Sequence, residues 1–289
     1  MNLFQAIIIG IIQGLTEFLP VSSNAHIRIV PALLGWEDPG AAFTAVIQLG
    51  TVLAVIIYFA KDLQRVSSAW VASLGGKDKD SVDARMGWAV LYGTIPIIIF
   101  GLGLKHQIEG NAFRSLYVIA GAMIGMGILM YAAEHFGKKE RGIETVTVKD
   151  GVIVGLWQCL ALIPGMSRSG STITGGLFRG MDRITAARFS FLLGLPSITL
   201  AALNELYSER KNILGPELTA TLVATGVSFI VGYAVISFFL KFLQKHGIAP
   251  FVIYRIALGL LLFGLLQTGH LKPDAGIQAK PDPQLSARR

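Results

Sequence analysis

The stretch that decides the fold is QGLTEFLPVSSNAH at residues 13–26, and a related one, PGMSRSGST, stands at residues 164–172. Both lie in long apolar sequence, yet the first contains a carboxylate and a histidine, and the second an arginine among hydroxyls. An ionisable group at membrane depth costs roughly 2.5 to 3.5 kcal/mol on insertion scales, so groups retained there indicate function. Pro20 and Pro164 each end a helix, because proline lacks a backbone N–H and clashes with the preceding turn. We therefore expect two broken helices that carry polar groups into a membrane.

Six apolar segments around these stretches approach the length of about 20 residues that a helix needs to cross a bilayer. They are residues 41–60, 88–104, 115–134, 189–206, 218–240 and 248–269. The longest hydrophilic connection, residues 61–87, is predicted to be a loop. A chain of 289 residues then leaves no room for a separate soluble domain. We predict one membrane domain over residues 1–270 and a disordered tail over residues 271–289, which is rich in proline and charge.

The two halves of the chain resemble one another. The order Gly-x-x-Gln-x-Leu followed by Pro-x-x-Ser occurs in residues 10–23 and again in residues 155–167. A second echo, at nearly the same offset, relates residues 43–51 to residues 189–197. Two matches in the same order favour an internal duplication over coincidence.

Each half, residues 1–147 and residues 148–270, consists of an interrupted apolar stretch followed by three spans. Non-helical backbone at membrane depth is tolerated only where protein buries it or where it lines a wet cavity. We therefore predict re-entrant helical hairpins at residues 2–35 and 151–183. An odd number of spans per half inverts the second copy. The expected fold class is an all-α integral membrane protein with six transmembrane helices and two re-entrant hairpins in an inverted-topology repeat.

The formal net charge of +7 does not indicate a nucleic-acid partner, because the basic residues lie in connections beside spans, where they set orientation. Most of them occur in residues 61–85, 138–149, 179–183 and 241–245. That side is predicted to be cytoplasmic. The loops of the opposite side hold Lys105, Arg114, Arg210 and Lys211. The mouth of the first hairpin is predicted to face outward.

Gln13 and Glu17 are four residues apart, so a helix places both on one face. A carboxylate and an amide oxygen suit a hard cation such as Mg2+ or Ca2+, with water or phosphate completing its coordination. The alternative is that Glu17 is a polar anchor paired with an arginine.

After the first break, residues 22–24 have the composition of a helix cap, and helix N-termini bind anions through free N–H groups. A capping role alone is the alternative. Ser23 and His26 are three residues apart, which brings a hydroxyl and an imidazole within reach of each other or of one phosphate. That spacing fits a nucleophile and its base, or direct attack by the histidine.

The second break opens into a turn rich in hydroxyls around Arg168. We predict a phosphate cradle in which Arg168 grips phosphoryl oxygens and neighbouring hydroxyls fill the remaining acceptors. The alternative is that Arg168 only neutralises Glu17. The stretch lacks the lysine of a Walker loop, so a nucleotide is not implied. Arg28 and Arg255 also lie in apolar sequence and are predicted to extend to a membrane interface.

These residues resemble the bacitracin-resistance (BacA) family of undecaprenyl-diphosphate phosphatases, over residues 3–269. The resemblance rests on residues 13–23 with His26, on residues 164–169 with Thr172, and on Ile253-Tyr254-Arg255. It implies removal of the terminal phosphate from undecaprenyl diphosphate, which yields the monophosphate carrier for peptidoglycan precursors. It also implies a bacterial plasma membrane, a divalent cation, and a site open to the outer leaflet.

On this resemblance, Gln13 and Glu17 handle the metal or a proton, and Ser23 and His26 are the nucleophile and base. The groups that bind the diphosphate are Ser22, Ser167, Arg168, Ser169 and Thr172. Which of Ser23 and His26 attacks stays open. The chain departs from the family at Gln13, where many members have Glu, and in residues 22–26, where Ser-Ser-Thr-Gly-His is common. One negative charge fewer is expected to weaken metal binding.

The rival class is a lipid-phosphate flippase or secondary transporter, because inverted repeats with broken helices are transporter architecture. A transporter needs charge to bind its anion but no nucleophile, so Ser23 with His26 favours the enzyme. The expected partners are the membrane and a polyprenyl diphosphate. A homodimer is compatible with the sequence.

Overall fold

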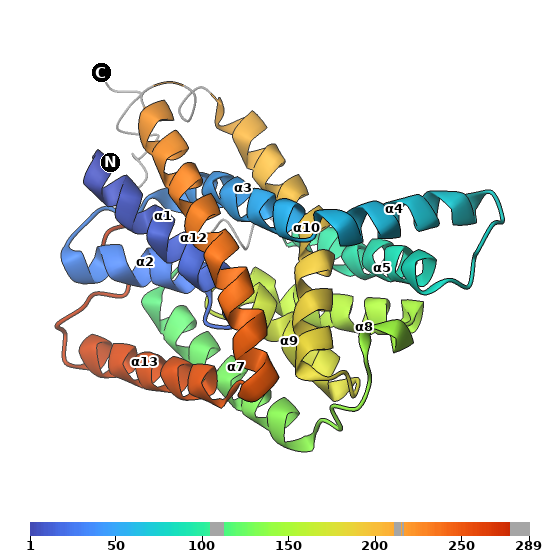
Figure 1. The fold of residues 1–289 in the computed structure, drawn as a ribbon. Coiled ribbons are helices and arrows are strands. Elements are labelled where there is room, and N and C mark those ends of the chain that lie inside the picture. Colours follow the sequence, from blue (N-terminus) through green and yellow to red (C-terminus); the bar gives the residue numbers. More distant parts are fainter. Residues whose placement is uncertain (105–112, 211–214, 216, 278–289) are drawn as a thin grey trace.

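The computed structural model describes residues 1–104, 113–210, 215 and 217–277, and it is built from helices (Figure 1). The helices are α1 Leu3–Phe18, α2 Ser23–Leu34, α3 Gly40–Tyr58, α4 Ala60–Leu74, α5 Val82–Gly103, α7 Leu116–Phe136, η1 Ile143–Thr145, α8 Val148–Gln158, η2 Cys159–Leu162, α9 Arg168–Phe178, α10 Arg183–Ser208, α12 Leu218–Lys245 and α13 Ala249–Gln267. The described ranges contain no strand, only an isolated bridge between Arg141 and Met181.

Among the described residues, five helices are long and apolar enough to cross a membrane, namely α5, α7, α10, α12 and α13. The bent pair α3 and α4 makes a sixth if it counts as one span. The expectation of an all-α membrane protein is confirmed. The inversion of the two halves, the domain limits and the orientation across the membrane stay predictions.

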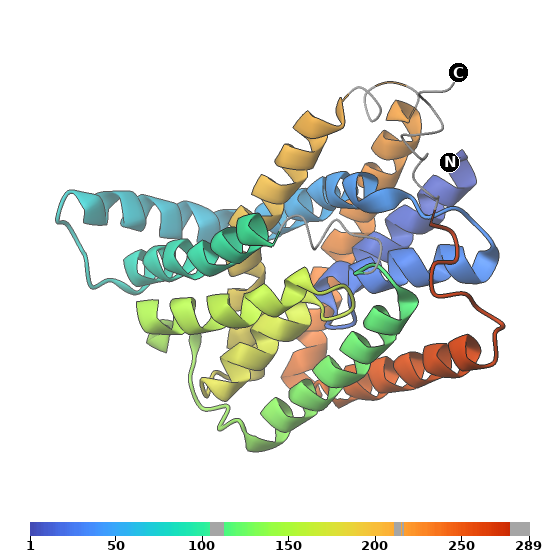
Figure 2. The same cartoon turned by 180° about the vertical axis from the view of Figure 1, so that it is seen from behind.

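The predicted loop at residues 61–87 is wrong over much of its length, because Ala60–Leu74 forms α4, bent by 80° from α3. This segment has no glycine or proline, and Leu63, Val66 and Trp70 recur at helical spacing. Leu63 and Val66 pack against the core, and Trp70 contacts Trp88 of α5. The hydrophilic composition of the segment led to the prediction of a loop, although its apolar residues have the spacing of an amphipathic helix. Figures 1 and 2 show α4 and the start of α5 projecting together from the body.

Both predicted breaks are present, each between short helices and next to a proline; that the two hairpins are re-entrant stays a prediction. Helices α1 and α2 flank the break at residues 19–22, and α8, η2 and α9 flank the break at residues 163–167. The four α-helices have 16, 12, 11 and 11 residues, so each is shorter than a typical span. Figures 1 and 2 show α13 alongside α7 on one side of the hairpins and α12 crossing α1 on the other.

Glycines let the first helix of each hairpin approach a spanning helix closely. A Cβ at Gly10 would lie 2.6 Å from the carbonyl oxygen of Ala224 in α12. A Cβ at Gly155 of α8 would lie 2.1 Å from the carbonyl oxygen of Gly93 in α5. Real Cβ atoms do not approach so closely, so these close helix contacts require glycine at both positions.

The carboxylate of Asp150 links the two ends of the second hairpin, opposite its break. Buried Asp150 accepts hydrogen bonds at 2.7 Å from Arg141, Arg179 and Thr147. Burial opposes its ionisation, but these bonds outweigh burial and hold the pKa of the Asp150 carboxyl well below its usual range. Arg141 also donates to the carbonyl oxygens of Arg179 and Thr145. This contact network ties the hairpin's ends together.

Residues 271–277 of the predicted tail pack on the body: the N–H of Leu116 donates to Pro273, and that of Asp38 donates to Gly276. The remaining tail, 278–289, lies outside the described residues, as do Lys105 and Lys211. Arg28, predicted to extend to a membrane interface, is only 2% exposed and pairs at 3.5 Å with Asp38 in the connection between α2 and α3.

Candidate functional site

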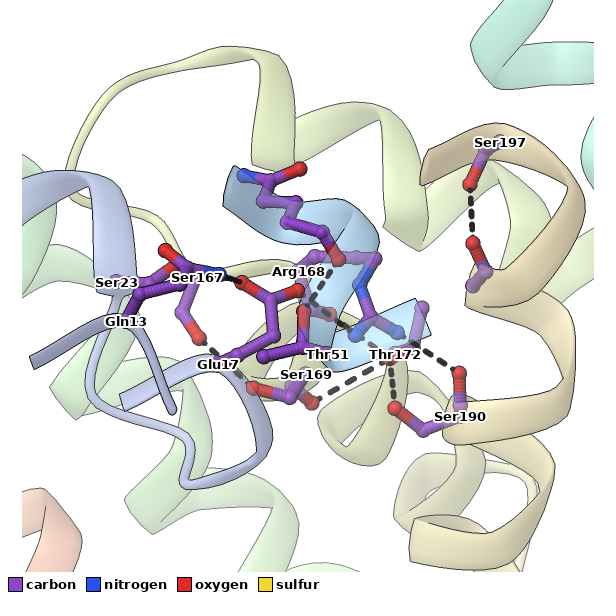
Figure 3. Close-up of polar contacts among 12 residues, drawn as sticks. Gln13, Glu17, Ser23, Thr51, Ser167, Arg168, Ser169, Thr172, Ser190 and Ser197 are labelled. Carbon is purple, nitrogen blue, oxygen red and sulfur yellow. Dashed lines mark hydrogen bonds and ion pairs between the residues drawn. The ribbon is translucent and has the colours of Figure 1, made fainter. Parts of the chain in front are cut away.

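Glu17 lies at the centre of the polar site and receives three side chains (Figure 3). Its Oε2 accepts hydrogen bonds from Gln13 Nε2 at 2.9 Å and from Ser23 Oγ at 2.7 Å. Its Oε1 pairs with Arg168 Nη2 at 3.1 Å. The carboxylate is only 6% exposed, so these contacts compensate its burial. The two hairpins therefore meet at one charged group.

Local backbone geometry explains why the hairpins meet there. Helix α1 places Gln13 and Glu17 on one face, and the break returns the chain so that Ser23 opens α2 against Glu17. Ser22 and Ser167 cap α2 and α9, with φ of 77° and 70°. Positive φ is uncommon for residues other than glycine, and such strain costs about 1–3 kcal/mol each and clusters at functional sites.

The guanidinium of Arg168 is held in place from several sides. Nη1 donates to the carbonyl oxygen of Ser190 at 3.0 Å, and Nη2 pairs with Glu17. The hydroxyl of Thr172 lies 2.8 Å from the carbonyl oxygen of Arg168 and 2.6 Å from Ser190 Oγ. Gly194 leaves room for the head group, because a Cβ there would lie 2.0 Å from Nη1. The arginine predicted by sequence is thus preorganised.

Two predicted phosphate ligands, Ser169 and Thr172, make contacts inside the protein and do not face the cavity. Ser169 Oγ donates to the carbonyl oxygen of Leu19 at 3.1 Å, which joins the second hairpin to the first. Ser169 and Thr172 are buried, and neither contributes to the wall of the cavity beside Glu17.

A cavity of about 170 Å³ opens beside the paired charges. Its polar wall includes the predicted site residues Glu17, Ser22, Ser23, Ser167 and Arg168. A second cavity of about 590 Å³ adjoins it. The two share Asn24, Gln48, Ile97, Ala161, Ser197 and Ala201. Isoleucine, leucine and alanine side chains make up much of the wall of the larger cavity. A polar chamber thus continues into an apolar one.

His26 is not in the cavity wall, and both of its ring nitrogens have protein partners. Nδ1 lies 2.7 Å from the carbonyl oxygen of Ser22, and Nε2 lies 2.7 Å from the hydroxyl of Tyr254. A carbonyl only accepts, so in the neutral ring the proton is on Nδ1, and Nε2 accepts from Tyr254. The hydroxyl of Ser23 donates to Glu17. The group beside Ser23 is therefore Glu17, which the spacing argument for His26 did not anticipate.

The prediction that Arg255 extends to a membrane interface is wrong, because its side chain is fully buried. It donates to the carbonyl oxygens of Pro20, Gly165 and Met166 at 3.0, 2.7 and 3.2 Å. A broken helix leaves carbonyls without partners, at a cost of about 1–3 kcal/mol for each buried one. Both breaks therefore need a hydrogen-bond donor. The sequence signal for this donor was an arginine inside a predicted span.

The residues fit a divalent cation only if a phosphate supplies part of its coordination. Gln13 Oε1 is buried and has no hydrogen-bond partner, as a ligand atom awaiting a cation would be. The carboxylate of Glu17 lies beside it, but it already pairs with Arg168. Across the described residues, no group of three or more His, Cys, Asp and Glu could hold a metal. Mg2+ commonly uses one or two carboxylates together with phosphates, which agrees with this donor set.

Candidate spans surround two broken helices, and an acid, a hydroxyl and an arginine converge beside a cavity. This arrangement defines a multi-pass membrane protein equipped to act on an anionic group. The family model described as "Bacitracin resistance protein BacA" matches residues 6–261. The chain therefore belongs to the BacA family.

Curated relatives agree over nearly the whole chain. The "Undecaprenyl-diphosphatase" of Chlorobaculum tepidum is 52% identical, over 94% of this chain and 100% of that protein. The protein of the same name in Myxococcus xanthus is 49% identical, over 96% of this chain and 94% of its own. The "Undecaprenyl-diphosphatase 1" of Corynebacterium jeikeium is 51% identical, over 93% and 96%.

Proposed function

We propose that this membrane protein hydrolyses undecaprenyl diphosphate to undecaprenyl phosphate and inorganic phosphate. This reaction would return the lipid carrier to peptidoglycan synthesis and confer bacitracin resistance. The observation that carries the proposal is the contact of Ser23 and Arg168 with the two oxygens of Glu17, beside a cavity that the three residues line. The names of the curated relatives support the same substrate.

In the proposed reaction, Ser23 Oγ attacks the terminal phosphorus and Glu17 accepts the hydroxyl proton. The hydrogen bond of 2.7 Å between them is the arrangement that activates a hydroxyl. The bond from phosphorus to the bridging oxygen breaks, and undecaprenyl phosphate leaves with the bonding electrons. The proton on Glu17 passes to water or to the departing monophosphate. Water, deprotonated by Glu17, then attacks the phosphorus of the phosphoserine. The bond from phosphorus to Ser23 Oγ breaks, Glu17 returns its proton to Ser23 Oγ, and inorganic phosphate is released.

Arg168 supplies fixed positive charge where negative charge accumulates on the phosphoryl oxygens. When the substrate enters, the guanidinium exchanges part of its contact with Glu17 for phosphoryl oxygens, and Glu17 becomes a better proton acceptor. In this proposal Ser22 and Ser167, which also line the cavity, donate to the diphosphate. Ser169 and Thr172 act by holding the two hairpins and Arg168 in register.

The proposed cofactor is Mg2+ or Ca2+, held by Gln13 Oε1 and Glu17 together with substrate phosphate oxygens. It would neutralise negative charge on the diphosphate when bound. The adjoining apolar cavity is the place proposed for the first isoprene units of the lipid. We place the site toward the outer leaflet of the bacterial plasma membrane, on the charge asymmetry of the loops. The proposal does not require a homodimer.

Purified protein in detergent, given a polyprenyl diphosphate with a divalent cation or with a chelator, provides the test. We expect release of inorganic phosphate that requires the cation. Movement of the lipid across the membrane of vesicles that contain the protein, without release of phosphate, would instead establish a transporter.

A further inference from the structure

Arg255 of α13 contacts the two hairpins at corresponding atoms. Nη1 donates to the carbonyl oxygen of Pro20, and Nη2 donates to that of Gly165. Each acceptor lies two residues before the serine with positive φ that caps the following helix, Ser22 in one hairpin and Ser167 in the other. One rigid guanidinium therefore fixes the distance between the two breaks.

Tyr254, the residue before Arg255 in α13, contacts the first break through His26. The hydroxyl of Tyr254 donates to His26 Nε2, and His26 Nδ1 donates to the carbonyl oxygen of Ser22. The rings of Tyr254 and His26 stack with centroids 5.6 Å apart. The strained residue next to Ser23 is thereby held through its carbonyl. Strained backbone persists only where its surroundings determine it strongly.

We propose that Tyr254, His26 and Arg255 form a positioning clamp that aligns the two hairpins, so that Ser23 and Arg168 meet at Glu17. In this clamp, His26 orients the backbone of Ser22 and exchanges no proton with the substrate. Lys could not replace Arg255, because a single ammonium lacks the fixed fork that spans the two breaks. The inference rests on the proposed function and adds to it the residues that preorganise its site.

Arg255→Lys tests the clamp, with Arg141→Lys as a matched control. Both arginines donate to backbone carbonyls of the second hairpin, but Arg141 does so at the hairpin's open end. Since misplacement of reacting groups by about 1 Å can cost 10²-fold, we expect kcat to fall by about 10- to 100-fold in Arg255→Lys with KM within about threefold. Arg141→Lys should lower Tm and leave kcat unchanged. Equal kcat in wild type and Arg255→Lys would overturn the clamp.

His26→Asn and His26→Ala decide the matter even if Arg255→Lys does not fold. An asparagine amide can donate to the Ser22 carbonyl as Nδ1 does, but it cannot act as a base at neutral pH. We expect His26→Asn to retain at least about tenfold more kcat than His26→Ala, with the pH profile of the wild type. If Asn is as inactive as Ala, or if the pH profile loses a limb, His26 is the base and the clamp is wrong. Wild type run alongside separates the two claims, because a wild type that releases no phosphate contradicts the proposed function.

Discussion

The two hairpins have similar backbones at their breaks but carry different chemistry. Ser22 and Ser167 have similar positive φ angles and the same capping role, and they are separated by the offset that separates Gln13 from Gln158. The next residue is Ser23 in one hairpin and Arg168 in the other, and both contact Glu17. At that offset, the counterpart of Glu17 is Leu162. A shared framework thus presents a hydroxyl and a cation from corresponding positions to one carboxylate.

Replacing that carboxylate should have the largest effect, since both hairpins depend on it. We expect Glu17→Gln to lower kcat by about 10²- to 10⁴-fold, the usual contribution of a general base. Phosphate release by purified protein measures this, and Glu144→Gln, at an exposed carboxylate, is the control. Activity near that of wild type would mean that the hairpins meet at Glu17 for structural reasons only.

The second-largest effect is expected at Arg168, the cation of the second hairpin. Arg168→Lys should lower kcat by about 10²- to 10³-fold, because a point charge cannot reproduce the planar contacts with two oxygens. Insertion into the membrane should persist. The assay is steady-state phosphate release from protein shown by gel filtration to be folded, and a loss below threefold would leave the second hairpin without a catalytic role.

A methyl group at Gly194 tests whether the position of Arg168 matters, apart from its charge. A Cβ there would lie 2.0 Å from Nη1, and the flexible head group would have to move. Since small misplacements are costly, Gly194→Ala should lower kcat by about 10- to 100-fold with little change in Tm. Gly226→Ala, where a Cβ meets open space, should match wild type in both measurements. Similar kcat in the two variants would contradict a preorganised arginine.

The smallest effect is expected at Gln13, whose amide donates a hydrogen bond to Glu17. Gln13→Glu adds a hard anionic ligand and should lower the concentration of Mg2+ or Ca2+ needed for half-maximal rate by a few-fold. Titration of both cations against rate in both proteins measures this. An unchanged midpoint would place Gln13 away from any metal.

Sequence predicted the helical class, both broken helices and the convergence of Glu17, Ser23 and Arg168 on one site. It placed His26 beside Ser23 from their spacing, but spacing cannot show that the ring turns toward Tyr254, which lies on a helix far away in the chain. The prediction that Arg255 extends to a membrane interface took account only of the water outside the span. The carbonyl oxygens at the breaks need a hydrogen-bond donor more strongly, and these acceptors come together only once the hairpins have folded.

The central claim is that Ser23 attacks with Glu17 as its base, and the covalent intermediate tests it most directly. Protein mixed with polyprenyl diphosphate and quenched rapidly in acid should carry an acid-stable phosphoester that peptide mapping places on Ser23, and Glu17→Gln should abolish its formation. A phosphoryl group that is acid-labile and maps to His26, or full turnover by Ser23→Ala without any phosphoenzyme, would contradict the account.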